Sequence, residues 1–467
     1  MLQNIPVEKI LRTATSNGAD MAELYAESAR TTAISNEDKK NDRVVTGVDK
    51  GYGIRVVFGD KTYYGFTSDP LEVSNVVASL TKGQEGGLSL RAAAGGEAIS
   101  RDELNLGDCH VALRAPRNDT LDVFRNALDA VERASVTAWK LSPLLKQVQV
   151  SLRSTNKRTW IVNSSGIETQ EERNDLIMVV LVVASKNGDV QTGYEPAGGS
   201  CGIELFERVR PEDISKNAVE RALTMLKARH APRGQMPVVI SSSAGGTLIH
   251  EAVGHGLEAD LVTQGMSIYK DKLGQQVASK LVTVVDDATL KDLRGTFKFD
   301  DEGTPSERTV LIENGVLKCY MQNKSTAKRM RTSITGNCRR ESFRHRPIVR
   351  MTNTFIVPNK DDPDAIVRSV AKGLFVKKMG GGQVNTINGD FVFEAQEAYL
   401  IENGQIGEPV RGATLIGNGP KVLMDIDMVG TDLGFGIGTC GKEGQGVPVG
   451  HGMPTIRIPE LTVGGTM

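Results

Sequence analysis

His250, Glu251 and His255 bring together, within six positions, the side-chain types of a zinc peptidase. In the common motif, two histidines four residues apart lie on one helix face, with a general-base glutamate beside them. Here the second histidine comes five residues after the first, and on a regular helix the two side chains would diverge by roughly 140°. Gly254 precedes the second histidine, and we expect the helix to end or to widen into a π-type turn there, so that both imidazoles can reach one ion.

The local sequence favours a functional site over a helix with two structural histidines. With 6 histidines in 467 residues, this pattern should arise by chance in on the order of one chain in a few hundred. Pro237 to Ile240 reads as a short buried strand, Ser241 to Ser243 offer capping hydroxyls, and a helix carrying His250 begins at Thr247. We therefore treat the segment as a candidate metal site.

A catalytic metal needs a third protein ligand and an open position for water. Glu258 and Asp260 follow the second histidine closely, whereas Cys440 lies far along the chain between glycines. A thiolate beside two imidazoles suits zinc, and the glycines would let a remote backbone approach closely. Residue chemistry alone leaves the choice between the cysteine and the two carboxylates open.

Composition narrows the classes of protein that need to be considered. The formal charge is −1, so nothing attracts the whole chain to nucleic acid or to an anionic membrane. The N-terminus has no basic segment followed by an apolar stretch, and the apolar run 176–184 is too short to span a bilayer. Five scattered cysteines indicate no disulfide framework. We expect a cytoplasmic protein that does not enter a membrane.

The pattern of the chain predicts an α+β fold in two domains. Prolines and a glycine at residues 230–237 interrupt the periodicity just before the histidine segment, so we place the boundary there. Residues 1–232 form a mixed α/β N-terminal domain with a flexible excursion near 83–97. Residues 237–467 form a largely β domain that carries the helix with the metal motif.

Individual elements follow from periodicity and turn residues. Helices are predicted over residues 6–16, 70–80, 120–138, 211–228 and 361–375, and strands over residues 22–34, 53–58, 61–66, 147–154, 157–163 and 176–185. The dipeptides Asn314-Gly315 and Asn403-Gly404 lie between apolar segments, and Asn-Gly is the strongest short-range signal for a β-hairpin.

Several stretches beyond the histidine segment resemble one known family. The stretches are His250–Glu258, Asp301–Pro305, Thr335–Ser342, Gly380–Val384, Cys440–Gln445 and Leu461–Thr466. Together they look like the TldD/PmbA family of metallopeptidases, densely from about Pro237 to the C-terminus and more weakly before it. The chain resembles the TldD type, because the TldE/PmbA partner type lacks the His-Glu-x-x-x-His motif.

This resemblance implies a metal-dependent peptidase acting on unfolded or extended peptides. It implies that His250, His255 and Cys440 bind the metal, zinc by the chemistry of the set, and that Glu251 is the catalytic carboxylate. A bound ion would lower the pKa of water and polarise the scissile carbonyl, and Glu251 would pass the water proton to the leaving amine. The resemblance also implies a dimer with a TldE/PmbA-like paralogue, or a homodimer. An exposed strand edge near the site could bind the peptide as an added strand.

Weaker signals leave other interpretations open. Residues 324–350 are rich in arginine and lysine, and without interleaved aromatics they favour a solvated or interface loop over a nucleic-acid surface. Arg339 or Arg340 could instead bind carbonyls or a carboxylate of a peptide. His451 could supply an oxyanion donor, or act as base for Cys440 in a cysteine peptidase. A non-catalytic peptide-binding regulatory subunit is the remaining alternative, and an intact Glu251 argues against it.

Overall fold

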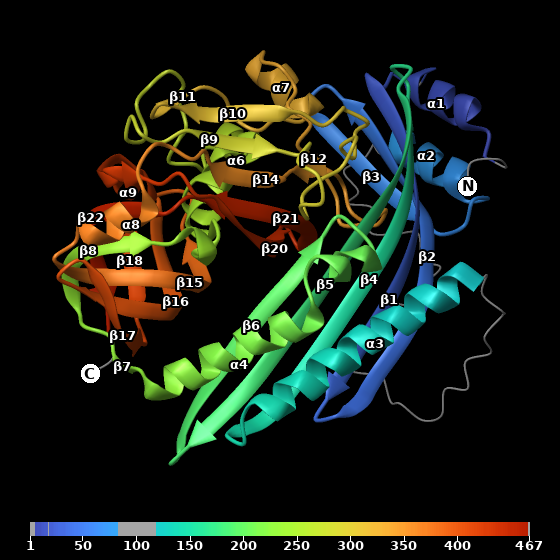
Figure 1. Cartoon of the computed structure of the whole chain (residues 1–467). Coiled ribbons are helices and arrows are strands. Elements are labelled where there is room, and N and C mark those ends of the chain that lie inside the picture. Colours follow the sequence, from blue (N-terminus) through green and yellow to red (C-terminus); the bar gives the residue numbers. More distant parts are fainter. Residues whose placement is uncertain (1–4, 17, 83–117, 466–467) are drawn as a thin grey trace.

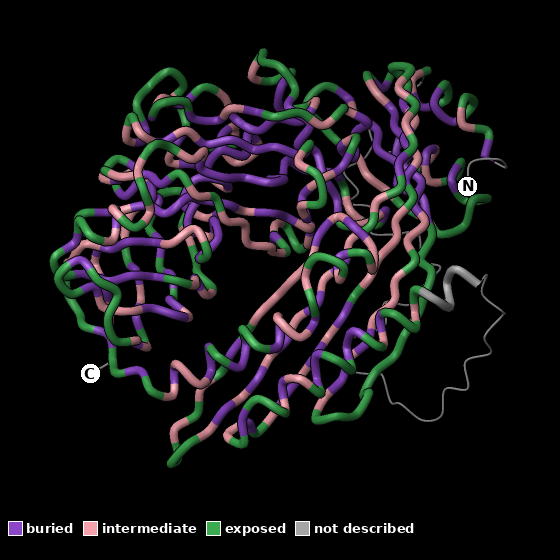
Figure 2. The backbone as a smooth tube through the Cα atoms, viewed as in Figure 1, coloured by how far each residue is buried: buried purple, intermediate pink, exposed green. Residues whose placement is uncertain are grey.

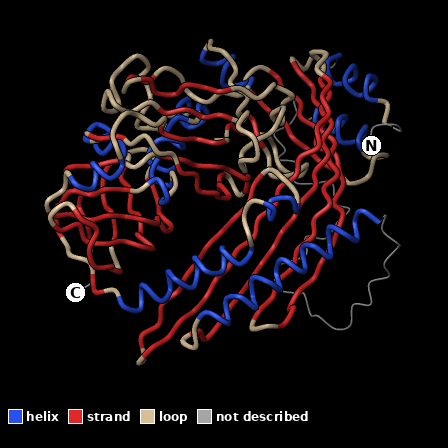
Figure 3. Tube along the Cα trace, in the orientation of Figure 1, coloured by secondary structure: helices blue, strands red, loops and turns tan. Residues whose placement is uncertain are grey.

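The computed structural model describes residues 5–16, 18–82 and 118–465 (Figure 1). The excursion expected near residues 83–97 lies outside this range. Helices and strands are mixed along the described residues, as Figure 3 shows, which confirms the predicted α+β class. In the described part of the chain, no helix has both the length and the apolar character needed to cross a lipid bilayer.

A twisted antiparallel sheet of six long strands forms the N-terminal part, in the order β3-β2-β1-β4-β5-β6 (Figure 1). Its strands are β1 (Met21–Glu37), β2 (Lys40–Phe58), β3 (Lys61–Thr67), β4 (Leu145–Asn163), β5 (Glu168–Lys186) and β6 (Asp189–Gly199). The hairpin expected around residues 59–60 is present between β2 and β3. The two strands predicted over 147–154 and 157–163 are one, because Thr155 and Asn156 stay in the ladder opposite Asp175 and Asn174.

Four helices cover one face of this sheet. They are α1 (Val7–Ser16), α2 (Val73–Lys82), α3 (Asn118–Leu141) and α4 (Pro211–Lys227). Even-numbered residues such as Leu24 on β1 and Val148 on β4 pack under them, because side chains alternate between the two faces of a strand. Odd-numbered residues such as Glu23 and Tyr25 therefore point away from the helices. They are nevertheless buried, because the C-terminal part of the chain covers that face.

The C-terminal part contains two larger sheets and one two-stranded sheet. The larger orders are β11-β10-β9-β14-β21-β20 and β15-β8-β22-β18-β16-β17-β7, and an additional β15–β16 pairing links two strands of the second. The strands are β7 (Arg229–His230), β8 (Gly234–Ile240), β9 (Val284–Asp287), β10 (Arg308–Glu313), β11 (Val316–Leu317), β12 (Cys338–Arg339), β13 (Ile348–Val349), β14 (Asn353–Ile356), β15 (Lys372–Val384), β16 (Asp390–Glu402), β17 (Gln405–Arg411), β18 (Thr414–Asn418), β19 (Met428–Val429), β20 (Gly434–Lys442), β21 (Gln445–Met453) and β22 (Ile456–Gly464).

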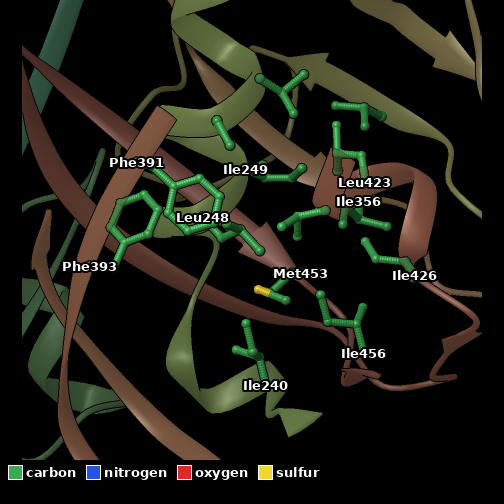
Figure 4. Packing of buried hydrophobic residues seen from close by; sticks show 14 of the residues in the cluster. Ile240, Leu248, Ile249, Ile356, Phe391, Phe393, Leu423, Ile426, Met453 and Ile456 are labelled. Carbon is green, nitrogen blue, oxygen red and sulfur yellow. The ribbon is translucent and has the colours of Figure 1, made fainter. Parts of the chain in front are cut away.

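Short helices lie among and around these sheets. They are α5 (Thr247–Ile249), α6 (Ala259–Thr263), α7 (Lys324–Met330), α8 (Pro363–Arg368) and α9 (Gly419–Asp425). Leu248 and Ile249, on the helix that leads to the histidines, pack among Phe391, Ile426 and Met453 (Figure 4). Figure 2 shows the buried backbone concentrated in these sheets, with exposed turns around them. The histidine segment therefore starts from a rigid support.

Two local expectations differ from the structure in instructive ways. The helix predicted over 361–375 ends at Arg368, and β15 begins at Lys372, because Leu374 and Val376 pair with β8 on one side and β16 on the other. The stretch 230–237, where prolines and a glycine were expected to interrupt regular structure, contains paired strands, since His230 pairs with β17 and β8 begins at Gly234. In both places tertiary pairing decides the backbone conformation, and local propensity does not.

Both Asn-Gly hairpins are confirmed. Asn314 and Asn403 have φ values of 48° and 51°, and the following Gly315 and Gly404 have 83° and 74°. Positive φ at both central residues is the signature of a type I′ turn, which suits the twist of antiparallel strands. The turns join β10 to β11 and β16 to β17.

Candidate metal centre

The helix that carries the histidines widens by one residue at the motif. After α5, residues His250–Gly254 form a π-helical turn, in which the backbone N–H of His255 donates to the carbonyl of His250. A π turn places residues five apart in the chain above one another. The widening expected from the five-residue spacing is therefore present.

Gly254 is required by close packing and not by an unusual backbone angle. Its φ and ψ of −54° and −56° are ordinary helical values. A Cβ atom at this position would lie 2.0 Å from Sδ of Met351, a side chain that is itself fully buried. Glycine thus lets the widened turn lie directly against the segment before β14.

Three side chains converge at this turn. The nearest ligand atoms of His250, His255 and Cys440 all lie within 4.8 Å of one another. Cys440, on β20, has its Sγ 3.5 Å from Nε2 of His255, and the two imidazole rings lie 5.0 Å apart between centroids, nearly perpendicular. Among the described residues, Cys440 is the only one of the three candidate third ligands that belongs to this group.

The other two candidates lie behind the cluster, joined to a lysine. Glu258 accepts from Nδ1 of His255 at 3.0 Å, on the ring edge turned away from the cysteine. Lys442 donates to Glu258 at 3.0 Å and to Asp260 at 2.7 Å. Sequence reasoning missed Lys442, although a signal existed. It stands two residues after Cys440, and strand alternation places both side chains on the same face of β20.

The environment sets opposite protonation tendencies for neighbouring groups. Burial, followed by the charge of His255, lowers the pKa of His250 to about 4, so this imidazole is neutral at pH 7. Burial would raise the pKa of Glu258, but Lys442 and His255 outweigh it and lower that pKa to about 2. Burial works against the charge of His255 as well, yet Glu258 and Cys440 hold its pKa well above the ordinary value.

A cavity of about 200 Å³ opens in front of the cluster and contains the proposed catalytic carboxylate. Glu251 is 24% exposed, and its Oε2 lies 3.9 Å from Nε2 of His255. His451 lines the same cavity with its ring 5.9 Å from that of His250. Burial, together with the charge of His250, lowers the pKa of His451 to about 3, so it too is neutral at pH 7.

Arg350 is a second residue that sequence reasoning missed. It is fully buried and donates to the backbone carbonyls of Cys440 and Gln445. The β20–β21 hairpin that presents the cysteine is thus held from behind by a guanidinium. This arginine belongs to the basic stretch 324–350, for which a solvated or interface loop was expected.

Arg339 and Arg340 also lie inside the protein. Arg340 donates to Glu23 at 2.8 Å and to the carbonyl of Asp301, and Arg339 donates to the carbonyl of Met351 at 2.7 Å. Neither lines the cavity in front of the histidines; both line a separate cavity under the N-terminal sheet. Their assignment to peptide binding stays a prediction.

Comparison with known proteins identifies the family of this chain. The chain matches the PmbA/TldA metallopeptidase domain 1 over residues 22–82, the central domain over residues 114–226 and the C-terminal domain over residues 233–465. A metalloprotease TldD homolog of Haemophilus influenzae is 39% identical over 96% of this chain and 93% of its own length. A protein of Saccharolobus solfataricus named zinc metalloprotease TldD homolog is 26% identical, covering 98% of this chain and 99% of its own length.

Solved structures share the fold at lower sequence identity. A putative modulator of DNA gyrase from Thermotoga maritima superimposes with a TM-score of 0.77 at 22% identity, over 98% of this chain and 99% of its own. TldE from Thermococcus kodakarensis gives a TM-score of 0.73 at 18% identity, over 98% and 100% of the two chains. The three domain matches and the full-length relatives carry the assignment, and the chain belongs to the TldD/PmbA family of metallopeptidases.

Proposed function

We propose that this chain is a zinc-dependent peptidase that hydrolyses unfolded or extended peptides, with His250, His255 and Cys440 as metal ligands and Glu251 as the catalytic carboxylate. The observation that carries the proposal is the convergence of the three ligand atoms within 4.8 Å beside an accessible carboxylate. Relatives named metalloprotease support the reaction class.

The residues fit a zinc ion in three respects. Nδ1 of His250 is buried and has no hydrogen-bond partner within the described residues, which is a costly arrangement unless something binds there. Two imidazoles and one thiolate form a borderline-soft set that zinc prefers. Glu258 accepts from the second nitrogen of His255, the support that metal-bound histidines commonly have.

The residues of the site have separate tasks in peptide hydrolysis. Zinc, when bound, polarises a carbonyl and makes water more acidic. Glu251 takes a proton from the attacking water on its carboxylate and delivers it to the departing amine. Neutral His451 faces the same cavity and can donate an N–H to the developing oxyanion. Glu258 and Lys442 keep the ring of His255 oriented.

The free edge of β20 is the surface on which we place the peptide. β20 lies at the end of its sheet and pairs with β21 alone. Because Glu443 and Gly444 form a two-residue turn, Ile437, Thr439 and Gly441 direct their backbone N–H and C=O groups to the unpaired edge. An added strand would bond there through its main chain, so we expect the enzyme to accept many sequences and to require an extended peptide.

The proposed partner is a TldE/PmbA-like paralogue, with a homodimer as the alternative. The support is the shared fold with TldE and the membership of the same family. Co-purification of the chain from its native host, followed by mass spectrometry, identifies the second subunit. Peptidase activity of the isolated chain would contradict a required heteromer.

Substitutions at two site residues test the proposed function. Glu251→Gln should retain one zinc per chain and lose peptide hydrolysis by at least about a hundredfold, the scale of a lost general base. Cys440→Ala should lose zinc as well as activity, which elemental analysis after dialysis measures. Parental rates in Glu251→Gln would refute the mechanism.

Chelation combined with thiol alkylation tests the cysteine-peptidase alternative. Sγ of Cys440 contacts the imidazole of His255, whereas the ring of His451 contacts His250. The geometry therefore does not favour a Cys440–His451 catalytic pair. An active enzyme after exhaustive chelation, inactivated by thiol alkylation, would establish the alternative.

A further inference from the structure

A large cavity lies between the helix-free face of the N-terminal sheet and the C-terminal part of the chain. Its volume is about 470 Å³, and strands β1, β4 and β5 line one side of it. The other side includes Arg294, Arg339 and Thr439. Thr439 also lines the cavity in front of the two histidines and Cys440, so the two cavities lie on either side of this residue of β20.

Most cations around this cavity are neutralised by nearby carboxylates. Arg294 pairs with Asp175 through two bonds of 2.8 and 3.0 Å. Arg173 pairs with Glu171 and Asp301, Arg340 with Glu23, and Arg344 with Asp49. Lys157 lies 3.2 Å from Glu27. These groups form a structural ion network that leaves little charge for a ligand.

Arg339 is different, because no carboxylate of the described residues lies within 4.0 Å of it. It is only 5% exposed, and the one side-chain hydrogen bond that it makes among the described residues is to the carbonyl of Met351. The ring of Phe297 supports the guanidinium at 5.4 Å. The nearest acids are already used, since Asp301 accepts from Arg173 and Arg340, and Asp286 accepts from Asn337, Thr352 and Thr354.

A buried guanidinium without a counter-ion is costly, because its charge has been removed from water without a compensating partner. The burial is reflected in the lowered pKa of Arg339, about 10. Buried charged groups with perturbed pKa values are concentrated at binding and catalytic sites, which makes Arg339 a candidate site for a ligand of opposite charge. The guanidinium offers a planar set of N–H donors that matches a carboxylate in a bidentate manner.

The strand alternation of β20 connects this arginine to a bound peptide. Cys440 points to the histidines, so Thr439 points to the opposite face, where it accepts from Arg294 in the same cavity that Arg339 lines. A peptide added to the β20 edge alternates in step, and its residue level with Thr439 directs its side chain or terminus to this face. The guanidinium of Arg339 thus lines the cavity that this part of the bound peptide would enter.

We propose that Arg339 binds a carboxylate of the peptide, so that the enzyme prefers an acidic side chain or a free C-terminus at one position beside the cleaved bond. This inference rests on the proposed peptidase function and names the substrate class of the same site. The carboxylate of the peptide would supply the negative charge that the folded chain lacks beside Arg339.

The test uses an unstructured peptide whose cleavage position is first mapped with the parental enzyme. Glu or Gln is placed at each flanking position in turn, with an amidated C-terminus, and a second series compares free and amidated termini of the Gln peptide. A charge-assisted hydrogen bond is worth about tenfold or more in kcat/KM. We expect that factor at one position or at the terminus, and the two series distinguish these sources.

The arginine is then replaced. Arg339→Gln should reduce the acid-to-amide ratio of kcat/KM to near one. Arg344→Gln, which removes a cation of the same cavity already paired with Asp49, should preserve the ratio. Should Arg339→Gln fail to fold, Arg339→Lys serves in its place and should lower the ratio through loss of bidentate geometry. A parental enzyme without acid preference, or an unchanged ratio in the Arg339 variant, overturns the inference.

Binding is measured separately so that the two proposals can fail independently. The Glu251→Gln protein with Arg339 intact should bind a fluorescent acidic peptide about tenfold more tightly than its amide counterpart, by anisotropy. If the parental chain cleaves nothing but this difference is present, the peptidase proposal fails and the carboxylate site stands. Equal affinities for the two peptides would overturn the carboxylate site alone.

Discussion

Two of the buried ion networks among the described residues differ in what their charges hold in place. The interface network comprises Glu23, Arg55, Asp301, Glu302 and Arg340, and it joins β1 and β2 to the C-terminal part. The site network comprises His255, Glu258, Asp260 and Lys442, and it ends at the group of His250, His255 and Cys440. Both are removed from water, yet only the second contains an imidazole with one nitrogen turned to a thiol.

The comparison distinguishes buried charges that stabilise the fold from buried charges that orient a proposed metal ligand. In the interface network arginines meet carboxylates directly, so each ion has a permanent partner and the contact between the two parts of the chain is fixed. In the site network, Lys442 keeps Glu258 ionised, and Glu258 orients His255 through Nδ1, which leaves Nε2 available. Removing a charge should therefore cost mainly stability in one network and mainly metal affinity in the other.

The largest effect is expected for Arg340→Met in the interface network. It leaves one oxygen of Glu23, a fully buried carboxylate, without its cation, and such losses cost about 3–5 kcal/mol. Urea unfolding measures the free energy of unfolding. The folded fraction should retain the parental zinc content; equal losses of zinc and stability would show that the two networks are not separate.

An acid titration probes the site network through Glu258, whose pKa of about 2 lies below its ordinary value of 4.5. Because the folded-state pKa is depressed, this stabilisation is full above about pH 4.5 and is lost as the pH falls toward 2. Its upper limit is about 3 kcal/mol. In the metal-free protein, Glu258→Gln should flatten that part of the stability–pH curve. A curve that keeps its parental slope would contradict the depressed pKa.

Lys442→Met should weaken zinc binding by about 10- to 100-fold, the usual consequence of losing support for a ligand. The reason is that Glu258 loses its cation and no longer fixes the ring of His255. Competition with a chromogenic chelator gives the affinity. Lys421→Met is the matched control, because this lysine pairs with Asp425 on the surface. Parental zinc affinity in Lys442→Met would show that this lysine does not support metal binding.

The smallest effect is expected for Arg344→Met. Arg344 pairs with Asp49 and so bridges the same two parts of the chain as Arg340, but it is 44% exposed. Exposed pairs contribute about 0–1 kcal/mol because water and salt screen them. Unfolding in low and high salt should show a difference within that range. A loss comparable to that of Arg340→Met would mean that burial does not explain the contrast.

Sequence patterns predicted the parts of the site that neighbouring residues determine. The five-residue spacing of His250 and His255 required a widened turn, and the structure has one. The reason for Gly254 was not accessible in the same way, because it depends on Met351, a residue about a hundred positions away that packs against the turn. Lys442 and Arg350 were missed since each acts through partners from distant segments.

The same division applies to the fold. Alternating strands, Asn-Gly turns and amphipathic helices were readable from local sequence, and the α+β class followed from them. The helix predicted over 361–375 was mostly wrong because pairing with β8 and β16 outweighed local propensity. The basic stretch 324–350 was predicted to be a solvated or interface loop, yet its Arg339, Arg340 and Arg350 are buried in the protein.

The sequence by itself determined which side chains could bind a metal, because residue types and spacing set the donor chemistry and the geometry of a single helical turn. The tertiary structure decided which of Glu258, Asp260 and Cys440 stands beside the two histidines, because only the pairing of β20 with β21 brings residue 440 to residue 255. It also decided that the buried Arg339 has no carboxylate within 4.0 Å among the described residues, whereas Arg173, Arg294 and Arg340 beside it are paired. Charge balance in a buried space depends on every segment that encloses it.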